Sequence, residues 1–242
     1  MLVAALDTAT PTLSCALLEL RPGAVEVLTT RTDPPAGPGV GHGIRLPGAL
    51  ADLLGAVGRK VPDLEGFAVG LGPGSFTGLR IGLATWKGLA YANRRPIAGV
   101  SSLAAMALEA AAALPPGSDA LLVPMLDARK GEVYAGFYRA TAGSVELVRP
   151  EEAVAPEALA ARLLGLGPAV GFGEGFAAHA GVLGATLPLL AGAPVHPSAD
   201  AVGRLAAPRL EAATFDDRAL FALEPHYVRK SEAEVKFPNG IP

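Results

Sequence analysis

The residues with the clearest chemical potential form a glycine-rich segment from Gly70 to Gly82. The segment lies between a predicted strand and a predicted helix, where glycines permit positive φ angles and the first helical N–H groups can face an anion. Its glycine spacing fits neither the G-x-G-x-x-G fingerprint nor the P-loop, and Ser75 does not stand in a G-x-S-x-G motif. We therefore expect Ser75 or Thr77 to cap the helix rather than to act as a nucleophile.

The helix that follows this segment carries a stripe of small residues. Gly78, Gly82 and Thr85 lie on one helical face, and the other faces are apolar. The stripe can pack within its own lobe, or it can let a helix of a second chain approach closely, and the sequence leaves both interpretations open. On the second interpretation, the expected partner-interface residues are Leu46, Leu50, Leu53, Gly78, Gly82, Thr85 and Trp86.

Metal binding and thiol chemistry are not indicated by the sequence. His42, His179, His196 and His226 are far apart, and none of them belongs to an H-x-x-x-H or H-E-x-x-H pattern, so we expect no metal site. Cys15 is the one cysteine, which excludes an internal disulfide. Because it lies in a predicted strand without a nearby basic partner, we interpret it as a packing residue.

Composition and charge limit the class of protein. The chain has 242 residues, of which 50% are hydrophobic and 18% are charged, and this indicates a globular protein. Its formal net charge of -3 contrasts with the basic excess of autonomous nucleic-acid binders, so another component would have to hold any bound RNA. The first residues lack the basic flank of a signal peptide, and prolines interrupt the uncharged stretch 175–199. We therefore expect a cytoplasmic protein without a membrane segment.

The elements that must position these residues follow the same order twice. Apolar runs and turn residues predict strands at 2–6, 13–20, 25–31, 67–71 and 97–100, with helices at 44–58, 76–92 and 102–114. After the candidate linker 115–118, they predict strands at 121–126, 132–139, 144–148 and 168–172, with helices at 156–164 and 199–210. The predicted division is an N-terminal lobe over residues 1–114 and a C-terminal lobe and tail over residues 119–242.

A repeated βββαβαβα order resembles the α/β fold of actin, hexokinase and Hsp70 (the ASKHA class), in which two lobes face each other across a cleft. The competing interpretation is a single α/β domain with an irregular second half. ATP-using members of the actin-like class clasp phosphates with glycine-rich hairpins after the first strand of each lobe. Here the first hairpin has no glycine and the second has one, Gly131. The sequence therefore predicts a degenerate nucleotide site, formed by Asp7, Thr8, Gly72, Gly74, Ser75, Thr77 and Asp127.

The glycine-rich segment also resembles the signature of the TsaB (YeaZ) family, the dimerisation subunit of the bacterial machinery that makes threonylcarbamoyladenosine in tRNA. Further segments resemble family motifs in the same order: Asp7-Thr8-Ala9-Thr10, His42, Val100-Ser101-Ser102-Leu103, Asp127-Ala128-Arg129-Lys130-Gly131-Glu132-Val133-Tyr134 and Pro225-His226-Tyr227-Val228-Arg229. The resemblance spans nearly the whole chain and is weaker over residues 140–217.

This resemblance implies a heterodimer with TsaD, the related subunit that transfers a threonylcarbamoyl group to the tRNA adenosine beside the anticodon. The small ATPase TsaE completes that assembly, and tRNA is reached indirectly through it. The chain would then be a scaffold and activator, with no catalytic residue and no cofactor of its own. Two alternatives stay open: an actin-like kinase or ATPase that uses Asp7 or Asp127 to orient a metal-bound water or a hydroxyl, and a homodimer through the same helical face.

Overall fold

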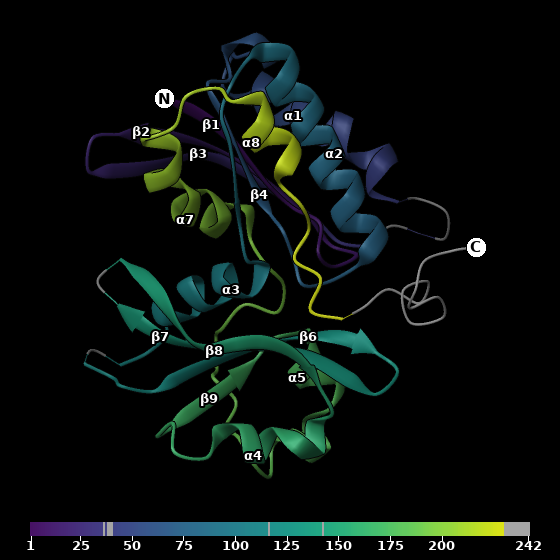
Figure 1. Cartoon of the computed structure of the whole chain (residues 1–242), viewed down its shortest axis with the longest axis vertical. Helices are drawn as coiled ribbons and strands as arrows, with labels where there is room; N and C mark the ends of the chain where they lie inside the picture. Colours follow the sequence, from purple (N-terminus) through teal and green to yellow (C-terminus); the bar gives the residue numbers. More distant parts are fainter. Residues whose placement is uncertain (36, 38–40, 116, 142, 230–242) are drawn as a thin grey trace.

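The computed structural model describes residues 1–35, 37, 41–115, 117–141 and 143–229, and it shows two lobes stacked along the long axis of the molecule (Figure 1). The tail of residues 230–242 and Pro116 of the predicted linker lie outside the described residues. A five-stranded sheet in the order β3-β2-β1-β4-β5 forms the N-terminal lobe. Its strands are β1 (Leu2–Asp7), β2 (Leu13–Arg21), β3 (Ala24–Asp33), β4 (Gly66–Gly70) and β5 (Ile97–Val100).

The C-terminal lobe repeats this arrangement with a four-stranded sheet in the order β8-β7-β6-β9. Its strands are β6 (Leu121–Arg129), β7 (Glu132–Thr141), β8 (Ser144–Val154) and β9 (Ala169–Phe172). In each lobe the first strand runs antiparallel to the second and parallel to the fourth, β1 to β4 and β6 to β9. The repeated order that the sequence predicts is therefore present in the topology.

The predicted helices are present with shifted ends, and the second half has three further short helices, at 174–178, 180–183 and 217–222, that the sequence did not predict. In the first half they are α1 (His42–Ala56), α2 (Phe76–Asn93) and α3 (Ser102–Ala111). In the second half they are α4 (Leu159–Leu163), α5 (Glu174–Ala178), α6 (Ala180–Leu183), α7 (Ala199–Glu211) and α8 (Asp217–Ala222). Among the described residues, no helix is both long enough and apolar enough to cross a membrane.

Both faces of the N-terminal sheet are covered. β1 and β4 are buried along their whole length, as expected of strands that have helices on both faces. α1 and α2 cover one face, and α7 covers the other through small side chains such as Ala201 and Ala206. Residues 199–222, which the predicted division assigned to the second lobe, thus pack on the first, because its apolar sheet has a second face to bury. The rest of that division stays a prediction.

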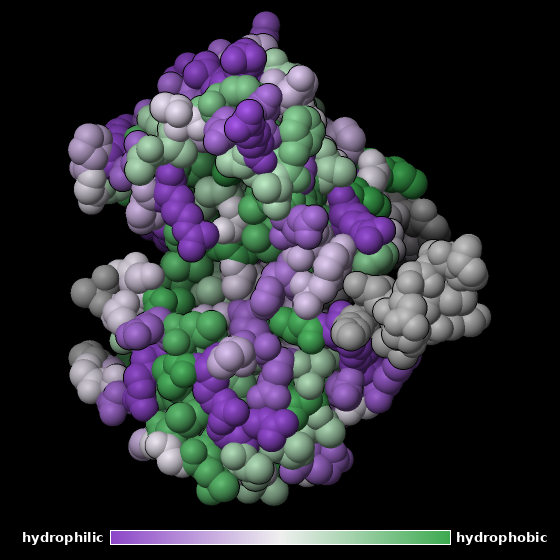
Figure 2. All heavy atoms as spheres, viewed as in Figure 1, coloured by the Kyte–Doolittle hydropathy of each residue, from purple (hydrophilic) through white to green (hydrophobic). Residues whose placement is uncertain are grey.

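The second lobe is less regular than the first. Where a fifth strand would stand, Leu189 forms an isolated parallel bridge with Gly171. Pro188, Pro194 and Pro197 interrupt this segment, and a proline has no N–H to donate to a ladder. α3 packs between the lobes, against β6 and β7 on one side and α7 on the other. Figure 2 shows a notch between the lobes on the left of the view, with apolar side chains at the surface there.

Candidate functional site

Asp7, one of the residues expected at a degenerate nucleotide site, is a buried carboxyl group at the end of β1. Its Oδ2 accepts a hydrogen bond of 2.6 Å from the Ser102 hydroxyl, and its Oδ1 accepts one of 2.8 Å from the Ala9 N–H. Burial raises the pKa of Asp7 to about 6, against the opposing effect of these two hydrogen bonds. A Cβ atom on Gly70 would overlap Oδ2, so the glycine there makes room for the carboxyl group. Both carboxylate oxygens are thus engaged within the lobe.

The glycine-rich loop between β4 and α2 uses its N–H groups within its own chain. Gly72 N–H donates to Oγ of Ser102 at 3.1 Å, and Ser75 N–H donates to the Ala9 carbonyl at 2.7 Å. A Cβ on Gly74 would overlap this same carbonyl, so close packing on the first hairpin requires the glycine. The loop is closed onto the hairpin, and these donors do not form a cradle for a phosphate. In the first hairpin, where an ATP-using relative clasps phosphate, the Ala9 N–H is bonded to Asp7 and Pro11 has no N–H, so this hairpin does not fit a nucleotide held in that manner.

Ser75 caps α2, as the sequence predicts. Its Oγ accepts a hydrogen bond of 3.2 Å from the Gly78 N–H. Thr77, the alternative cap, is exposed on the first turn, whereas Thr8 is fully buried and its Oγ1 has no hydrogen-bond partner. The glycine-rich loop and the Asp7 hairpin are brought together, but they form a packed junction.

Asp127 lies in the other lobe, at the start of the hairpin between β6 and β7. Its Oδ1 accepts a hydrogen bond of 2.7 Å from the Arg129 N–H, and its Oδ2 lies 3.0 Å from the Arg129 guanidinium. Within the described residues, no hydrogen bond or ion pair joins Asp127 to Asp7. Each aspartate has local partners that account for its charge. Among the described residues, moreover, no group of three or more His, Cys, Asp or Glu side chains could hold a metal ion.

The residues expected at a partner interface lie mainly in the core. Leu46, Leu50, Leu53 and Trp86 are at most 6% exposed, and the Trp86 indole donates to the Ala4 carbonyl at 3.0 Å. Cβ atoms on Gly78 and Gly82 would overlap Thr8, so the small stripe lets α2 approach the first hairpin. These positions are therefore corrected to packing within the lobe. Thr85 is the exception, since its side chain is partly exposed and donates to the Ile81 carbonyl at 2.8 Å.

A different face of the same helices is open to solvent. Phe76, Arg80, Ala84 and Tyr91 are exposed on α2, and Ile44 is 70% exposed on α1. The Arg80 guanidinium lies 3.8 Å from the centre of the Phe76 ring, which also stacks on Tyr227 at 5.4 Å. The spacing of 76, 80 and 84 was visible in the sequence. Because α2 is apolar on several sides, that spacing did not indicate which face was buried.

Sequence reasoning missed a second buried carboxyl group, Glu151 on β8, which is 3% exposed. The hydroxyls of Ser101 and Tyr138 donate to its Oε1, and Nε2 of His226 lies 3.1 Å from its Oε2. The alignment at Oε2 is that of an ion pair rather than a directed hydrogen bond. The contact with Glu151 raises the pKa of His226. The pKa of Tyr138 is raised mainly by burial and to a smaller extent by Glu151. The partners of Glu151 lie 13, 50 and 75 residues away along the chain, which hid this cluster from motif analysis.

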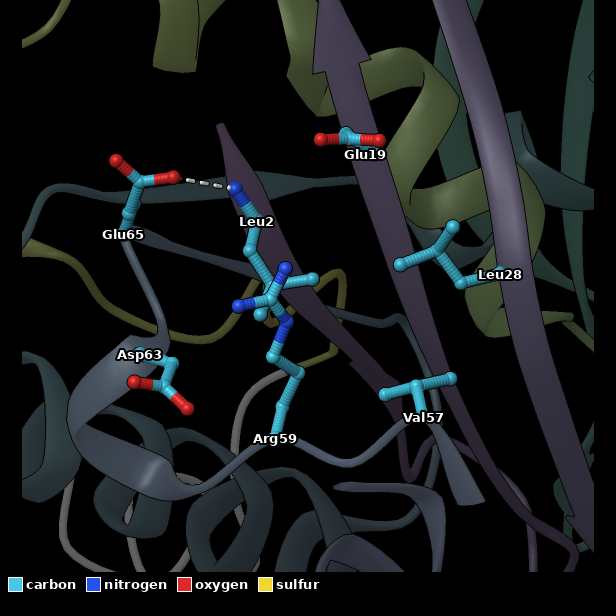
Figure 3. A pocket seen from close by; sticks show the side chains of 7 residues that line it. All are labelled: Leu2, Glu19, Leu28, Val57, Arg59, Asp63 and Glu65. Carbon is cyan, nitrogen blue, oxygen red and sulfur yellow. Dashed lines mark hydrogen bonds between the residues drawn. The ribbon is translucent and has the colours of Figure 1, made fainter. Parts of the chain in front are cut away.

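A surface pocket at the start of β1 offers less chemistry (Figure 3). Its lining residues are Leu2, Glu19, Leu28, Val57, Arg59, Asp63 and Glu65. Glu65 accepts a hydrogen bond of 2.8 Å from the Leu2 N–H, Asp63 accepts one from the Lys60 N–H, and Glu19 pairs with Arg21. Its carboxylates thus have structural partners.

Cys15 is a packing residue, as predicted. Burial raises the pKa of its thiol to about 12, so the reactive thiolate does not form near neutral pH.

Two stacked lobes with a repeated strand order, and with helices between and around them, define a protein of the actin-like class. Over residues 38–172 the chain matches the family model described as "TsaD: tRNA N6-adenosine threonylcarbamoyltransferase". It belongs to this family and, within it, to the TsaB (YeaZ) group. The recognition made from the glycine-rich segment is confirmed.

The most informative relatives carry the TsaB name. The Bacillus subtilis tRNA threonylcarbamoyladenosine biosynthesis protein TsaB is 36% identical over 154 residues, which are 64% of this chain and 62% of that one. The Escherichia coli protein of the same name is 38% identical over 98 residues, 40% of this chain and 41% of its own. The chain therefore spans less than two thirds of either relative.

Solved structures extend the likeness to almost the full chain. The structure described as YeaZ from Pseudomonas aeruginosa is 28% identical, with a TM-score of 0.73 over 93% of this chain and 99% of that one. A second Pseudomonas aeruginosa structure, described as similar to peptidase YEAZ, is 29% identical, with a TM-score of 0.75 over 94% and 99% of the two chains. The fold predicted from the element order is confirmed.

Proposed function

We propose that this chain is a non-catalytic accessory subunit in the biosynthesis of tRNA threonylcarbamoyladenosine, which binds and activates TsaD in an assembly with TsaE. The observation that carries the proposal is the state of the first hairpin, which an ATP-using relative would use to clasp phosphate. Here it has no glycine, its Ala9 N–H donates to Asp7, and Pro11 has no N–H to offer. The names of the TsaB relatives support the pathway.

The proposed contact surface for TsaD is the exposed face of α1 and α2. Phe76, Arg80 and Tyr91 are residue types that anchor protein interfaces, and Ile44 is an exposed apolar side chain on α1. The net charge of -3 argues against strong independent binding to RNA, so tRNA would be held mainly by the assembled complex.

The proposal is tested by threonylcarbamoylation of tRNA in vitro. The cognate TsaD and TsaE are supplied with the activated threonylcarbamoyl donor, with and without this protein. We expect turnover to require the chain and the chain alone to show none. If TsaD were equally active without it, the scaffold role would be wrong. Stoichiometric ATP binding by the isolated protein, lost in Asp7→Ala, would then favour the kinase or ATPase alternative.

The surface is tested by a single exposed substitution. Ala84→Arg places a large charged side chain on the exposed face of α2, and we expect the affinity for TsaD to fall about tenfold or more. Ala160→Arg, at an exposed position on α4 of the other lobe, is the matched control and should bind normally. Equal affinities for the two variants would exclude this face. Sedimentation of each variant alone shows whether a homodimer uses the same surface.

A further inference from the structure

Residues 223–229 contact both lobes after the chain has returned to the N-terminal lobe. Just before them, Leu220 on α8 is 2% exposed and belongs to the core beneath α1 and α2. The segment then leaves α8 and passes between the lobes without forming helix or strand (Figure 1). On the side of the N-terminal lobe, Tyr227 stacks on Phe76, its hydroxyl accepts a hydrogen bond of 3.0 Å from Arg80, and the His226 N–H donates to the Leu71 carbonyl at 2.7 Å.

The same short segment also holds the C-terminal lobe. Nε2 of His226 lies 3.1 Å from Oε2 of Glu151 on β8. Arg229 donates to the Ala128 carbonyl at 3.0 Å and pairs with Glu132, at the two ends of the hairpin between β6 and β7. Neighbouring residues of this segment therefore contact opposite lobes. A change in the angle between the lobes would stretch or break either the contacts with the N-terminal lobe or those with the C-terminal lobe.

The contacts of this segment are of the kind that open and close readily. None of residues 223–229 is fully buried, and the His226 side chain is 49% exposed. Segments held by a few polar contacts, with little buried apolar surface, open at a low free-energy cost. Glu151, by contrast, is 3% exposed, and its hydrogen bonds from Ser101 and Tyr138 do not involve the segment. Glu151 is thus held in place by the second lobe and α3, whereas His226 can move away from it.

We propose that residues 223–229 are a releasable clasp between the lobes, and that the contact of His226 with Glu151 is its latch. The Ser101, Glu151 and His226 groups do not form a hydrolytic triad, because the carboxylate stands between the hydroxyl and the imidazole instead of behind the imidazole. Release frees the lobes to change their angle and uncovers the Leu71 carbonyl at the start of the glycine-rich loop. It also removes Tyr227 from Phe76 and Arg80 on α2. The proposal does not depend on the function proposed above.

The test measures the separation of the lobes in the full chain. Spin labels are attached at Ala51→Cys on α1 and Ala160→Cys on α4, both exposed, with Cys15→Ala removing the buried native thiol. Distances are compared in this background and with His226→Ala or Glu151→Gln added. We expect both additions to give longer and broader distance distributions. The matched control is His196→Ala, since His196 makes a similar contact of 3.4 Å with Glu174 inside the second lobe, and we expect it to leave the distribution unchanged.

Amide hydrogen exchange provides a second measurement that does not require the lobes to move far. The His226 amide N–H donates to the Leu71 carbonyl, and loss of the ion pair with Glu151 should let this bond open more often, so we expect its exchange to be about tenfold faster in Glu151→Gln. Circular dichroism identifies any variant that fails to fold, and the conservative Glu151→Gln then carries the test. If a folded Glu151→Gln protein keeps both the original distance distribution and the original His226 exchange rate, the clasp proposal is wrong.

Discussion

At the scale of single residues, burial decides what each polar group can do. Asp7 has the residue type and the position of a catalytic carboxylate, yet its oxygens accept hydrogen bonds from Ser102 and Ala9. Glu151 has no motif around it and nevertheless organises three other side chains. The chemistry of both carboxyl groups follows from what surrounds them.

The raised pKa of Asp7 predicts a pH dependence of stability. The pKa is about 6 in the folded protein and 3.8 as the ordinary value, so the folded state binds the proton more tightly. The tighter binding of this proton stabilises the folded state. The stabilisation is full below pH 3.8 and is lost as the pH rises to about 6 and above. We expect the stability of wild type relative to Asp7→Asn to fall by roughly 3 kcal/mol across this window. Urea unfolding of both proteins between pH 4 and 7 measures it, and a constant difference would contradict the prediction.

Gly82 predicts a steric effect with an internal control. A Cβ on Gly82 would overlap Oγ1 of Thr8 and lie 3.2 Å from Cδ2 of Leu6, whereas one on Gly88 would meet nothing within 4 Å. We expect Gly82→Ala to lose about 1–3 kcal/mol of unfolding free energy through overpacking. Gly88→Ala should gain up to about 1 kcal/mol, because alanine favours the helix. Chemical unfolding of the two variants compares them directly, and equal stabilities would show that α2 shifts to accommodate the methyl group.

At the scale of elements, the N-terminus of α3 does more than begin a helix. The Ser101 hydroxyl caps α3 by accepting from the N–H groups of Leu103 and Ala104, and it also donates to Glu151 on β8. The equivalent Ser75 of α2 caps its helix through Gly78 alone. α3 is thereby tied to the sheet of the second lobe at its first turn.

These two caps give a matched pair of substitutions. Ser75→Ala should cost about 1 kcal/mol, the usual value for a lost N-cap. Ser101→Ala should cost about 2 kcal/mol or more, because it also removes a donor from the buried Glu151 carboxylate. Unfolding of the two variants in urea measures the difference. A smaller loss for Ser101→Ala than for Ser75→Ala would mean that Glu151 finds another donor.

At the scale of the whole molecule, the lobes are not independent segments of chain. The helix α7 packs on β1 and β4, where Val202 and Ala206 share a core cluster with Val3, Ala5 and Ala68. Along the chain, α7 comes after the whole sheet of the second lobe. The first lobe therefore completes its core only after nearly the whole chain has been made.

Because α7 completes the core of the first lobe, we expect that residues 1–114, the N-terminal lobe predicted from the sequence, do not fold alone. Without α7, the apolar face of its sheet stays exposed to water, and such a face favours aggregation. Circular dichroism and thermal unfolding of the fragment test this expectation, with the full chain as the control. A cooperative unfolding transition of the soluble fragment would contradict it and would support the simple division of the chain at residues 114 and 119.

Local pattern was enough to predict the strands, the longer helices, a cap at Ser75 or Thr77 and the packing role of Cys15. Periodicity, turn residues and capping act over a few neighbouring positions, so one sequence contains their signal. The inward face of α2, the docking of α7 and the Glu151 cluster required the folded molecule. A helix that is apolar on several sides can turn any of them inward, and contacts such as Ser101 with Glu151 or Arg229 with Glu132 join residues 50 and 97 positions apart. Such pairs meet only because the packing of two lobes brings them together.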